Sequence, residues 1–361
     1  MHVIACDQIS NNGYKASMKR QVWQTNKAGA IDRLKLLSDD LGLLEQGNIR
    51  VEVRAVGLNF ADIFAITGLY SATPKGAFVP GLEFSGVVAE VSGINNDYSV
   101  GDKVMGVSRF GGYATLIDSA PEYLTPLPKS WTFEQGAAYL VQTLTAYYAL
   151  TDLGNIKTGH SVLIHSAAGG VGLQAMKLVQ LMGGSPIGTV GSQGKKAFLQ
   201  TQGFTDVYVR SKVFKQQLEQ DKRHFDLVLD GVGGAVQKAS FDHLNPMGRL
   251  VVFGAAEFTP GKNRPQYLKA ALQYIKRPKY DVMNMISDNK SVMAFNLIWL
   301  WQQVAYLTEL IKSMQEYDIS PPHVGHVYSF DDAHSAIQCL RKGQSIGKVV
   351  LKVKAKAAIN Y

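Results

Sequence analysis

Cysteine is scarce in this chain of 361 residues, which contains only Cys6 and Cys339. Two cysteines so far apart exclude a disulfide framework and a zinc site built from several cysteines, and they favour a cytoplasmic location. Long apolar runs are also missing. The longest, Met293–Trp301, is too short to span a bilayer, so we expect a buried helix there. Residues 1–17 lack the features of a secretory signal and are expected to form an N-terminal extension.

Charged residues are also few, at 18% against 46% hydrophobic residues, which is typical of a globular protein and excludes wholesale disorder. The 37 basic and 29 acidic residues leave a net charge of +8, which favours anionic ligands. No nucleic-acid-binding signature is present, so no nucleic acid is expected. Basic residues gather in Glu257–Asn289. We expect solvated surface there and no membrane contact, with a membrane or partner patch as the alternative.

Hydrophobic patterning changes along the chain. Residues 18–128 contain short alternating runs such as Ile49–Val56, separated by many glycines, which predicts a small β-rich domain. After Pro128, Thr132 and Gln135 form a capping-box pattern that predicts a helix extending to Leu150.

Strand and helix patterns then alternate. The expected strands are Ser161–His165, Pro186–Val190, Asp206–Val209, Phe225–Asp230 and Arg249–Phe253, with helices at Leu173–Met182 and Lys195–Gln202. This order predicts βαβ crossovers and a parallel sheet covered on both faces. The tail is expected to return to mixed structure and rejoin the first domain, with strands at His326–Phe330 and Lys348–Val353 and a helix at Asp331–Arg341. Residues 129–317 would therefore be inserted into a domain made of residues 18–128 and 318–361.

A glycine loop follows the first strand of this alternating region. The sequence SVLIHSAAGGVG ends at Gly172, and Ala167, Gly169 and Gly172 occupy the three small-residue positions of a dinucleotide fingerprint. These positions allow a tight turn, a close approach to pyrophosphate and close helix packing, and the phosphates bind at the helix N-terminus. The strand before the loop and the helix after it support a dinucleotide site. The residues expected to face the phosphates are Ala168, Gly169, Gly170 and Val171.

The end of the next strand indicates which dinucleotide binds. An NAD site places an acidic residue there for the ribose 2′-hydroxyl, but Gly188–Lys196 contains no carboxylate. A 2′-phosphate needs donors and positive charge, so the stretch favours NADP. The predicted contacts are Gly191, Ser192, Lys195 and Lys196, with Arg210 reaching the same phosphate. The alternative is that the lysines only solvate the start of a helix.

Several motifs resemble the medium-chain dehydrogenase/reductase superfamily, in the expected order from Met18 to Val353. They are Gly57–Asp62 (GLNFAD), Gly68–Tyr70, Pro80–Gly86, Gly101–Val104, Leu144–Tyr148, Ala167–Gly172 and Gly347–Val350. The nearest branches are the zeta-crystallin-like quinone oxidoreductases and the vesicle amine transport protein group. The resemblance implies an α/β fold, in which a Rossmann doubly wound parallel sheet is inserted into a GroES-like β-rich domain. It also implies NADPH in the cleft and a homodimer.

The resemblance also bears on metal chemistry. In zinc-dependent members, the positions matching Asn59 and Leu82 are Cys and His, and a further Cys lies near Val141; none of these ligands is present here, nor is the four-cysteine lobe. We therefore expect no metal. Without a Lewis acid, the reaction needs an already electrophilic carbon, as in a quinone or an α,β-unsaturated carbonyl compound.

The resemblance implies three catalytic candidates, Asn59, Tyr70 and Thr145. Asn59 would lie near the nicotinamide or the substrate oxygen, and Thr145 would contact the nicotinamide ribose or amide. Tyr70 is either a hydroxyl donor at the cleft mouth or a packed aromatic residue with a satisfied hydroxyl. The remaining expected cofactor contacts are Val232, Phe253, Gly254, Ala255 and Lys348. Two alternatives stay open: an enoyl-thioester reductase, and a cofactor-binding module whose task is interaction.

Overall fold

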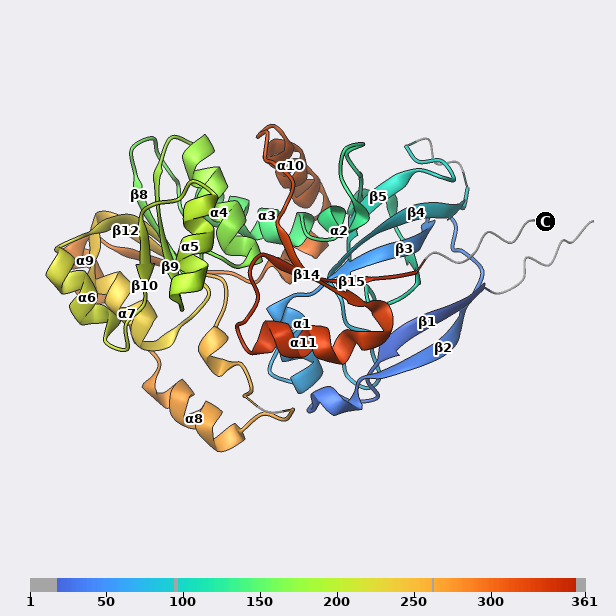
Figure 1. Ribbon diagram of the computed structural model, residues 1–361, viewed down its shortest axis with the longest axis horizontal. Helices are drawn as coiled ribbons and strands as arrows, with labels where there is room; N and C mark the ends of the chain where they lie inside the picture. Colours follow the sequence, from blue (N-terminus) through green and yellow to red (C-terminus); the bar gives the residue numbers. More distant parts are fainter. Residues whose placement is uncertain (1–17, 94–96, 262, 355–361) are drawn as a thin grey trace, which may run out of the picture.

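The computed structural model describes residues 18–93, 97–261 and 263–354, and these residues contain three β-sheets (Figure 1). The predicted extension at 1–17 and the end of the tail at 355–361 lie outside the described residues. The two larger sheets lie side by side, one at the left of Figure 1 and the other at the right.

The six-stranded sheet is entirely parallel, in the order β10-β9-β8-β11-β12-β13. Its strands are β8 (Ser161–Ile164), β9 (Ser185–Val190), β10 (Val207–Val209), β11 (Phe225–Asp230), β12 (Leu244–Val252) and β13 (Ser291–Ala294). Successive side chains along a strand of this sheet point to opposite faces and pack in different hydrophobic cores. Leu227 and Leu229 pack in one hydrophobic cluster and Val228 in another. The near-continuous apolar strands therefore follow from burial on both faces.

Helices cover the two faces of this sheet. They are α3 (Leu140–Tyr148), α4 (Gly170–Leu181), α5 (Gln193–Thr201), α6 (Phe214–Asp221), α7 (Gly234–Asp242) and α10 (Val304–Gln315). Leu144, Leu178 and Leu307 share one core, whereas Leu218 and Phe241 belong to the core on the other face.

The seven-stranded sheet runs in the order β14-β15-β3-β4-β5-β7, and β6 also pairs with β3. Its strands are β3 (Ile49–Gly57), β4 (Glu83–Val91), β5 (Lys103–Val107), β6 (Leu116–Ser119), β7 (Leu124–Pro126), β14 (Val324–Ser329) and β15 (Lys348–Lys352). Helices α1 (Phe60–Thr67) and α11 (Ala333–Arg341) pack with this sheet, and β1 (Met18–Gln24) pairs with β2 (Lys35–Leu41) beside it. The tail thus joins the sheet formed by the first part of the chain, and the predicted fold class is confirmed. The exact domain boundaries stay a prediction.

Two local predictions differ from the structure. The capping box at Thr132 and Gln135 is present, but the helix predicted to extend to Leu150 is interrupted: α2 (Phe133–Gly136) ends after one turn, and α3 begins at Leu140 and continues as a π-helix at Ala149–Leu153. The expected buried helix at Met293–Trp301 is instead the end of β13 followed by a 3₁₀ helix at Leu297–Gln302. Parallel pairing of β13 with β12 overrides the helical preference, and the Asn296 side chain caps the 3₁₀ turn by accepting from the Ile298 N–H.

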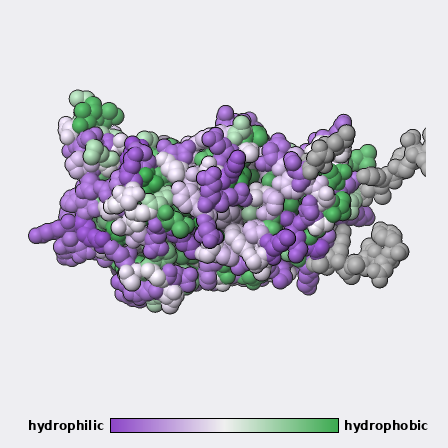
Figure 2. Space-filling model, turned by 90° about the horizontal axis from the view of Figure 1, so that it is seen from above, coloured by the Kyte–Doolittle hydropathy of each residue, from purple (hydrophilic) through white to green (hydrophobic). Residues whose placement is uncertain are grey.

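The basic segment Glu257–Asn289 forms two helices, α8 (Tyr267–Lys276) and α9 (Val282–Asp288), and none of the residues of either helix is buried. α8 projects from the lower edge of the molecule in Figure 1. The segment is exposed, as expected for a solvated surface, but its exposed side chains are not all polar: they include Leu268 and Ile275, at 78% and 68% exposure. The face seen in Figure 2 is mostly hydrophilic. Among the described residues, no helix is both long enough and apolar enough to cross a bilayer.

Candidate active site

A cavity of about 680 Å³ lies between the two larger sheets. It is lined by residues from the glycine loop, from α1 and α3, from the segments after β12 and β13, and from the start of β15. Ten of the predicted site residues line it: Asn59, Tyr70, Thr145, Gly169, Gly170, Val171, Phe253, Gly254, Ala255 and Lys348. The other predicted residues, Ala168, Gly191, Ser192, Lys195, Lys196, Arg210 and Val232, are not part of this lining.

The glycine loop has the geometry that the fingerprint predicts. α4 starts at Gly170, and its N-cap, Gly169, provides no side-chain cap, so the first N–H groups of the helix are available to a phosphate. A Cβ atom on Gly172 would lie 2.4 Å from the Ser166 carbonyl oxygen, so only glycine fits this close helix packing. Ala168 is buried, and its carbonyl oxygen accepts from the Gly347 N–H at 2.8 Å, which ties the loop to the segment before β15.

Positive charge gathers where β9 and β10 end. The Ser192 hydroxyl caps α5 by accepting from the Lys195 N–H, and Arg210 Nη1 donates to Thr189 Oγ1 at 3.1 Å. Burial, and then the charge of Arg210, lower the pKa of Lys195, so these two cations are close enough to influence each other. Lys195 Nζ donates to the Gly343 carbonyl oxygen at 2.8 Å. Such an edge suits a phosphate better than a ribose hydroxyl.

Asp230 at the end of β11, a carboxylate whose charge acts on Arg210, is fully buried and already engaged. It accepts from the N–H groups of Val232 and Gly233 and from Gln237 Nε2. His165, which directly follows β8, is buried between Thr189 Oγ1 and Ser240 Oγ, each at 2.8 Å. Burial lowers the pKa of His165 to about 3, so its imidazole is neutral at pH 7.

A buried polar cluster forms the floor of the cavity, and sequence reasoning missed two of its members, Glu83 and Gln142. Lys348 Nζ donates to Glu83 Oε1 at 2.5 Å and to Asn59 Oδ1 at 2.9 Å. Gln142 Nε2 donates to the same two oxygens at 3.0 and 2.7 Å, respectively. Asn59 Nδ2 donates to Glu83 Oε1 and to the Gly57 carbonyl oxygen. Lys348 is 3% and Glu83 1% exposed, so this ion pair is shielded from water.

The cluster changes the interpretation of two predicted residues. Both amide hydrogens and the carbonyl oxygen of Asn59 are engaged within the protein, so Asn59 holds the floor together instead of offering a free donor to a substrate. Lys348 was expected to contact the cofactor, but its ammonium group donates to Asn59 Oδ1 and Glu83 Oε1. Gly170 has no side chain to displace Gln142, whose Oε1 would lie 2.6 Å from a Cβ atom there.

Asp62 lies beneath this floor. Its Oδ2 accepts from the Asn59 N–H at 2.7 Å and from the Tyr113 hydroxyl at 3.2 Å, whereas Oδ1 is buried without a partner. Burial raises the pKa of Asp62 to about 7, against smaller opposing effects of the Asn59 N–H and the Lys348 charge.

Replacing Asp62 with asparagine tests this burial. Between pH 4 and 7, roughly, the folded protein holds a proton that the unfolded chain has lost, so stability falls as the pH rises through this window. We expect Asp62→Asn to remove this loss of stability. Its free energy of unfolding should exceed that of the original protein by about 1–3 kcal/mol at pH 8 and by less at pH 5. Urea unfolding at the two pH values measures it. The control is Asp102→Asn, since Asp102 is exposed and also accepts a backbone bond, from the Ser99 N–H. An unchanged pH dependence in Asp62→Asn would contradict the assignment.

Two further hydroxyl groups face the cavity. The Tyr70 hydroxyl donates to Asn296 Oδ1 at 2.7 Å, joining the end of α1 to the segment after β13. Burial raises the pKa of Tyr70 to about 12, so the hydroxyl keeps its proton at pH 7. Thr145 Oγ1 donates to the Val141 carbonyl oxygen within α3, and its lone pairs remain able to accept.

The mouth of the cavity lies beside the basic segment. Phe258 and Tyr274 of this segment line the cavity. The Asn263 carbonyl oxygen, in the same segment, accepts from the Ile31 N–H at 2.8 Å. The segment therefore joins the part of the chain after β12 to the part that carries the seven-stranded sheet.

The fold and the cavity define a two-domain oxidoreductase scaffold with a dinucleotide-type loop, and comparisons with known proteins agree. Residues 45–129 match the family described as "Alcohol dehydrogenase GroES-like domain", and residues 202–351 match "Zinc-binding dehydrogenase". The human "Synaptic vesicle membrane protein VAT-1 homolog" is 30% identical over 330 residues, which cover 90% of this chain and 84% of that protein.

Solved structures point the same way. A quinone oxidoreductase of Pseudomonas syringae pv. Tomato has a TM-score of 0.77 and 26% identity, with 93% of this chain and 100% of that chain covered. The CurK enoyl reductase has a TM-score of 0.78 and 25% identity, with 93% and 99% covered. A mycobacterial protein in complex with NADPH has a TM-score of 0.77 and 25% identity, with 92% and 99% covered. The chain belongs to the medium-chain dehydrogenase/reductase superfamily, in the branch with the quinone oxidoreductases and VAT-1 homologues.

The name of the second matching family implies zinc, but the residues at the expected ligand positions do not fit this metal. Asn59 provides a fully engaged amide, and Leu82 and Val141 provide alkyl groups. The Lys348 ammonium lies 2.9 Å from Asn59 Oδ1, so a zinc ion bound at Asn59 would lie close to a positively charged side chain that repels it. Among the described residues, no group of three or more His, Cys, Asp or Glu side chains is placed to hold a metal ion.

Proposed function

We propose that this protein is a zinc-independent, NADPH-dependent oxidoreductase that reduces quinones or α,β-unsaturated carbonyl compounds. The observation that carries the proposal is one cavity lined by both an uncapped glycine-loop helix and a protonated tyrosine hydroxyl. The superfamily membership, the quinone oxidoreductase neighbour and the neighbour in complex with NADPH support it.

The chain's own residues have separable tasks in this proposal. The N–H groups of Gly170 and Val171 bind the pyrophosphate, and Ser192, Lys195, Lys196 and Arg210 bind the 2′-phosphate. When bound, NADPH supplies the hydride. The Tyr70 hydroxyl exchanges Asn296 for the substrate oxygen and stabilises the negative charge that develops on it. Phe253 and Ala255 supply apolar walls that exclude water, and the buried cluster around Lys348 keeps the floor rigid.

Steady-state NADPH oxidation tests the proposal with three substrates: 1,2-naphthoquinone, an alkenal and crotonyl-coenzyme A. Turnover with either of the first two supports it. A preference for crotonyl-coenzyme A would favour the enoyl-thioester reductase that the CurK neighbour suggests. Tight NADPH binding without turnover of any substrate would favour an interaction module. The cytoplasmic location, the homodimer and the absence of nucleic-acid and membrane partners stay predictions.

Cofactor selectivity provides a second test. Arg210→Gln removes a partly buried cation, so we expect the Kd for NADPH to rise about 10- to 100-fold, as for loss of a charge-assisted hydrogen bond, while the Kd for NADH changes little. Titrations followed by nicotinamide fluorescence measure both constants. Lys157→Gln, an exposed site far along the chain from Arg210, should leave both unchanged. Equal losses for the two cofactors, or tighter binding of NADH by the original protein, would contradict the NADPH assignment.

A further inference from the structure

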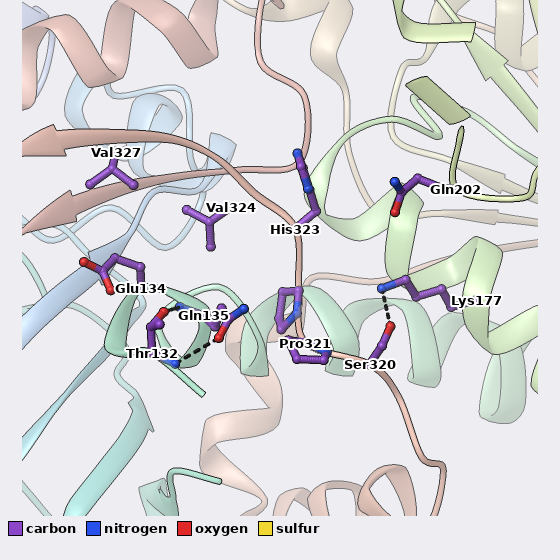
Figure 3. A pocket seen from close by; sticks show the side chains of 11 residues that line it. Thr132, Glu134, Gln135, Lys177, Gln202, Ser320, Pro321, His323, Val324 and Val327 are labelled. Atoms are coloured by element: carbon purple, nitrogen blue, oxygen red, sulfur yellow. Dashed lines mark hydrogen bonds between the residues drawn. The ribbon is translucent and has the colours of Figure 1, made fainter. Parts of the chain in front are cut away.

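A second cavity, of about 490 Å³, lies where the chain passes between the two larger sheets. Thr132, Glu134 and Gln135 come from the first connection, after β7. Ser320–His323 belong to the second connection, before β14, and Val324 is the first residue of that strand. Lys177 of α4 and Gln202 at the end of α5 complete one side (Figure 3). Both connections between the sheets therefore share a single hollow of a size typical for small ligands.

The cavity has positive charge without a counterion. Lys177 Nζ donates to the neutral Ser320 Oγ at 2.8 Å, and within the described part of the chain no carboxylate lies within ion-pair distance of it. His323 faces the same space, with its ring held against Phe198 at 4.7 Å between centroids. Burial lowers the pKa of both Lys177 and His323, and the charges of Lys177 and His326 lower that of His323 further. No neighbouring carboxylate among the described residues opposes these shifts in either pKa.

The carboxylate in the lining does not balance these groups. Glu134 and Lys177 lie on opposite sides of Figure 3, with Gln135 and Pro321 between them. Its Oε1 is paired with Lys352 Nζ at 2.8 Å. An anionic group is thus favoured at the Lys177 side, and the amide of Gln202 there adds a neutral donor.

We propose that this connection cavity binds a small anion through a carboxylate or phosphate group, held between Lys177 and His323. The anion replaces the missing counterion of Lys177 and joins the parallel sheet to the segment that leads into β14. Neither the relatives' names nor the dinucleotide site account for this cavity.

The connection cavity is coupled to the cofactor loop through Gly347. A Cβ atom on Gly347 would lie 2.2 Å from the His323 carbonyl oxygen, so the two backbones are in close contact. The Gly347 N–H donates to the Ala168 carbonyl oxygen, and the Lys348 N–H donates to that of His323, at 2.8 and 2.9 Å. An anion that fixes His323 also fixes the loop behind the proposed pyrophosphate site. We therefore expect tighter NADPH binding with the anion present; this second effect rests on the proposed function, whereas anion binding itself does not.

Isothermal titration calorimetry of the full chain with inorganic phosphate, and separately with acetate, tests anion binding without any nucleotide. Ionic strength is matched with sodium chloride. We expect saturable binding that Lys177→Gln weakens about tenfold or more, and that His323→Gln also weakens. Lys157→Gln is the control for loss of a surface charge. Lys196→Gln is the control for phosphate bound at the proposed 2′-phosphate site.

The outcomes separate the possibilities. Binding of both anions that depends on Lys177 indicates a general carboxylate and phosphate site, and binding of phosphate alone restricts it to phosphate groups. No saturable binding, equal affinity in Lys177→Gln and the original protein, or a loss confined to Lys196→Gln would each overturn the proposal. If the anion binds as expected but leaves the Kd for NADPH unchanged, the coupling is overturned and the site remains.

Discussion

Lys348→Met is expected to lower the free energy of unfolding by about 3–5 kcal/mol, because it leaves a buried carboxylate without its counter-charge. Glu83 is 1% exposed, and the Lys348 ammonium is its only ion-pair partner among the described residues. The same substitution removes a donor to Asn59 Oδ1. Urea unfolding at pH 7 measures the loss.

The matched control lies on the same strand. Lys352 also pairs with a glutamate, Glu134, but its side chain is 63% exposed, so Lys352→Met should have a much smaller effect. The double variant Lys348→Met with Glu83→Gln should recover part of the stability, because no charge is then left buried. A loss in Lys348→Met no greater than that in Lys352→Met would show that the buried pair is energetically unimportant.

Tyr70→Phe is expected to lower kcat with a reactive quinone or alkenal by about 100-fold or more, as for loss of one hydrogen bond to a developing oxyanion. The aromatic ring and its packing remain, and only the hydrogen bond of the Tyr70 hydroxyl is lost. The Kd for NADPH should therefore change less than about threefold. Steady-state kinetics together with a fluorescence titration separate the two effects.

Tyr123→Phe is the control for the loss of a tyrosine hydroxyl. Its hydroxyl donates to the Trp301 carbonyl oxygen at 3.0 Å, and Tyr123 does not line the cavity. Activity should therefore survive in Tyr123→Phe. If both variants keep full activity, Tyr70 is a packed aromatic residue with a satisfied hydroxyl, the alternative that the sequence left open.

Local signals in the sequence predicted much of the parallel sheet. Phe225–Asp230 forms the expected strand, and the small residue at Gly172 allows the close approach that the fingerprint requires. Prediction failed where tertiary contacts override local preference. Met293 and Ala294 pair with β12 instead of entering a helix, and Trp299 is 45% exposed while its neighbour Trp301 is 5% exposed.

The sequence by itself determined the order of strands and helices, the glycine loop and the lack of an acidic residue after β9, because each depends on residues close together in the chain. Only the tertiary structure decided the floor of the cavity. Pairing of β15 with β3, and of β3 with β4, brings Lys348 and Asn59 to Glu83, across 265 residues in the case of Lys348 and Glu83. No local pattern encodes such contacts, since they exist only when separate strands share a sheet and exclude water from the groups between them.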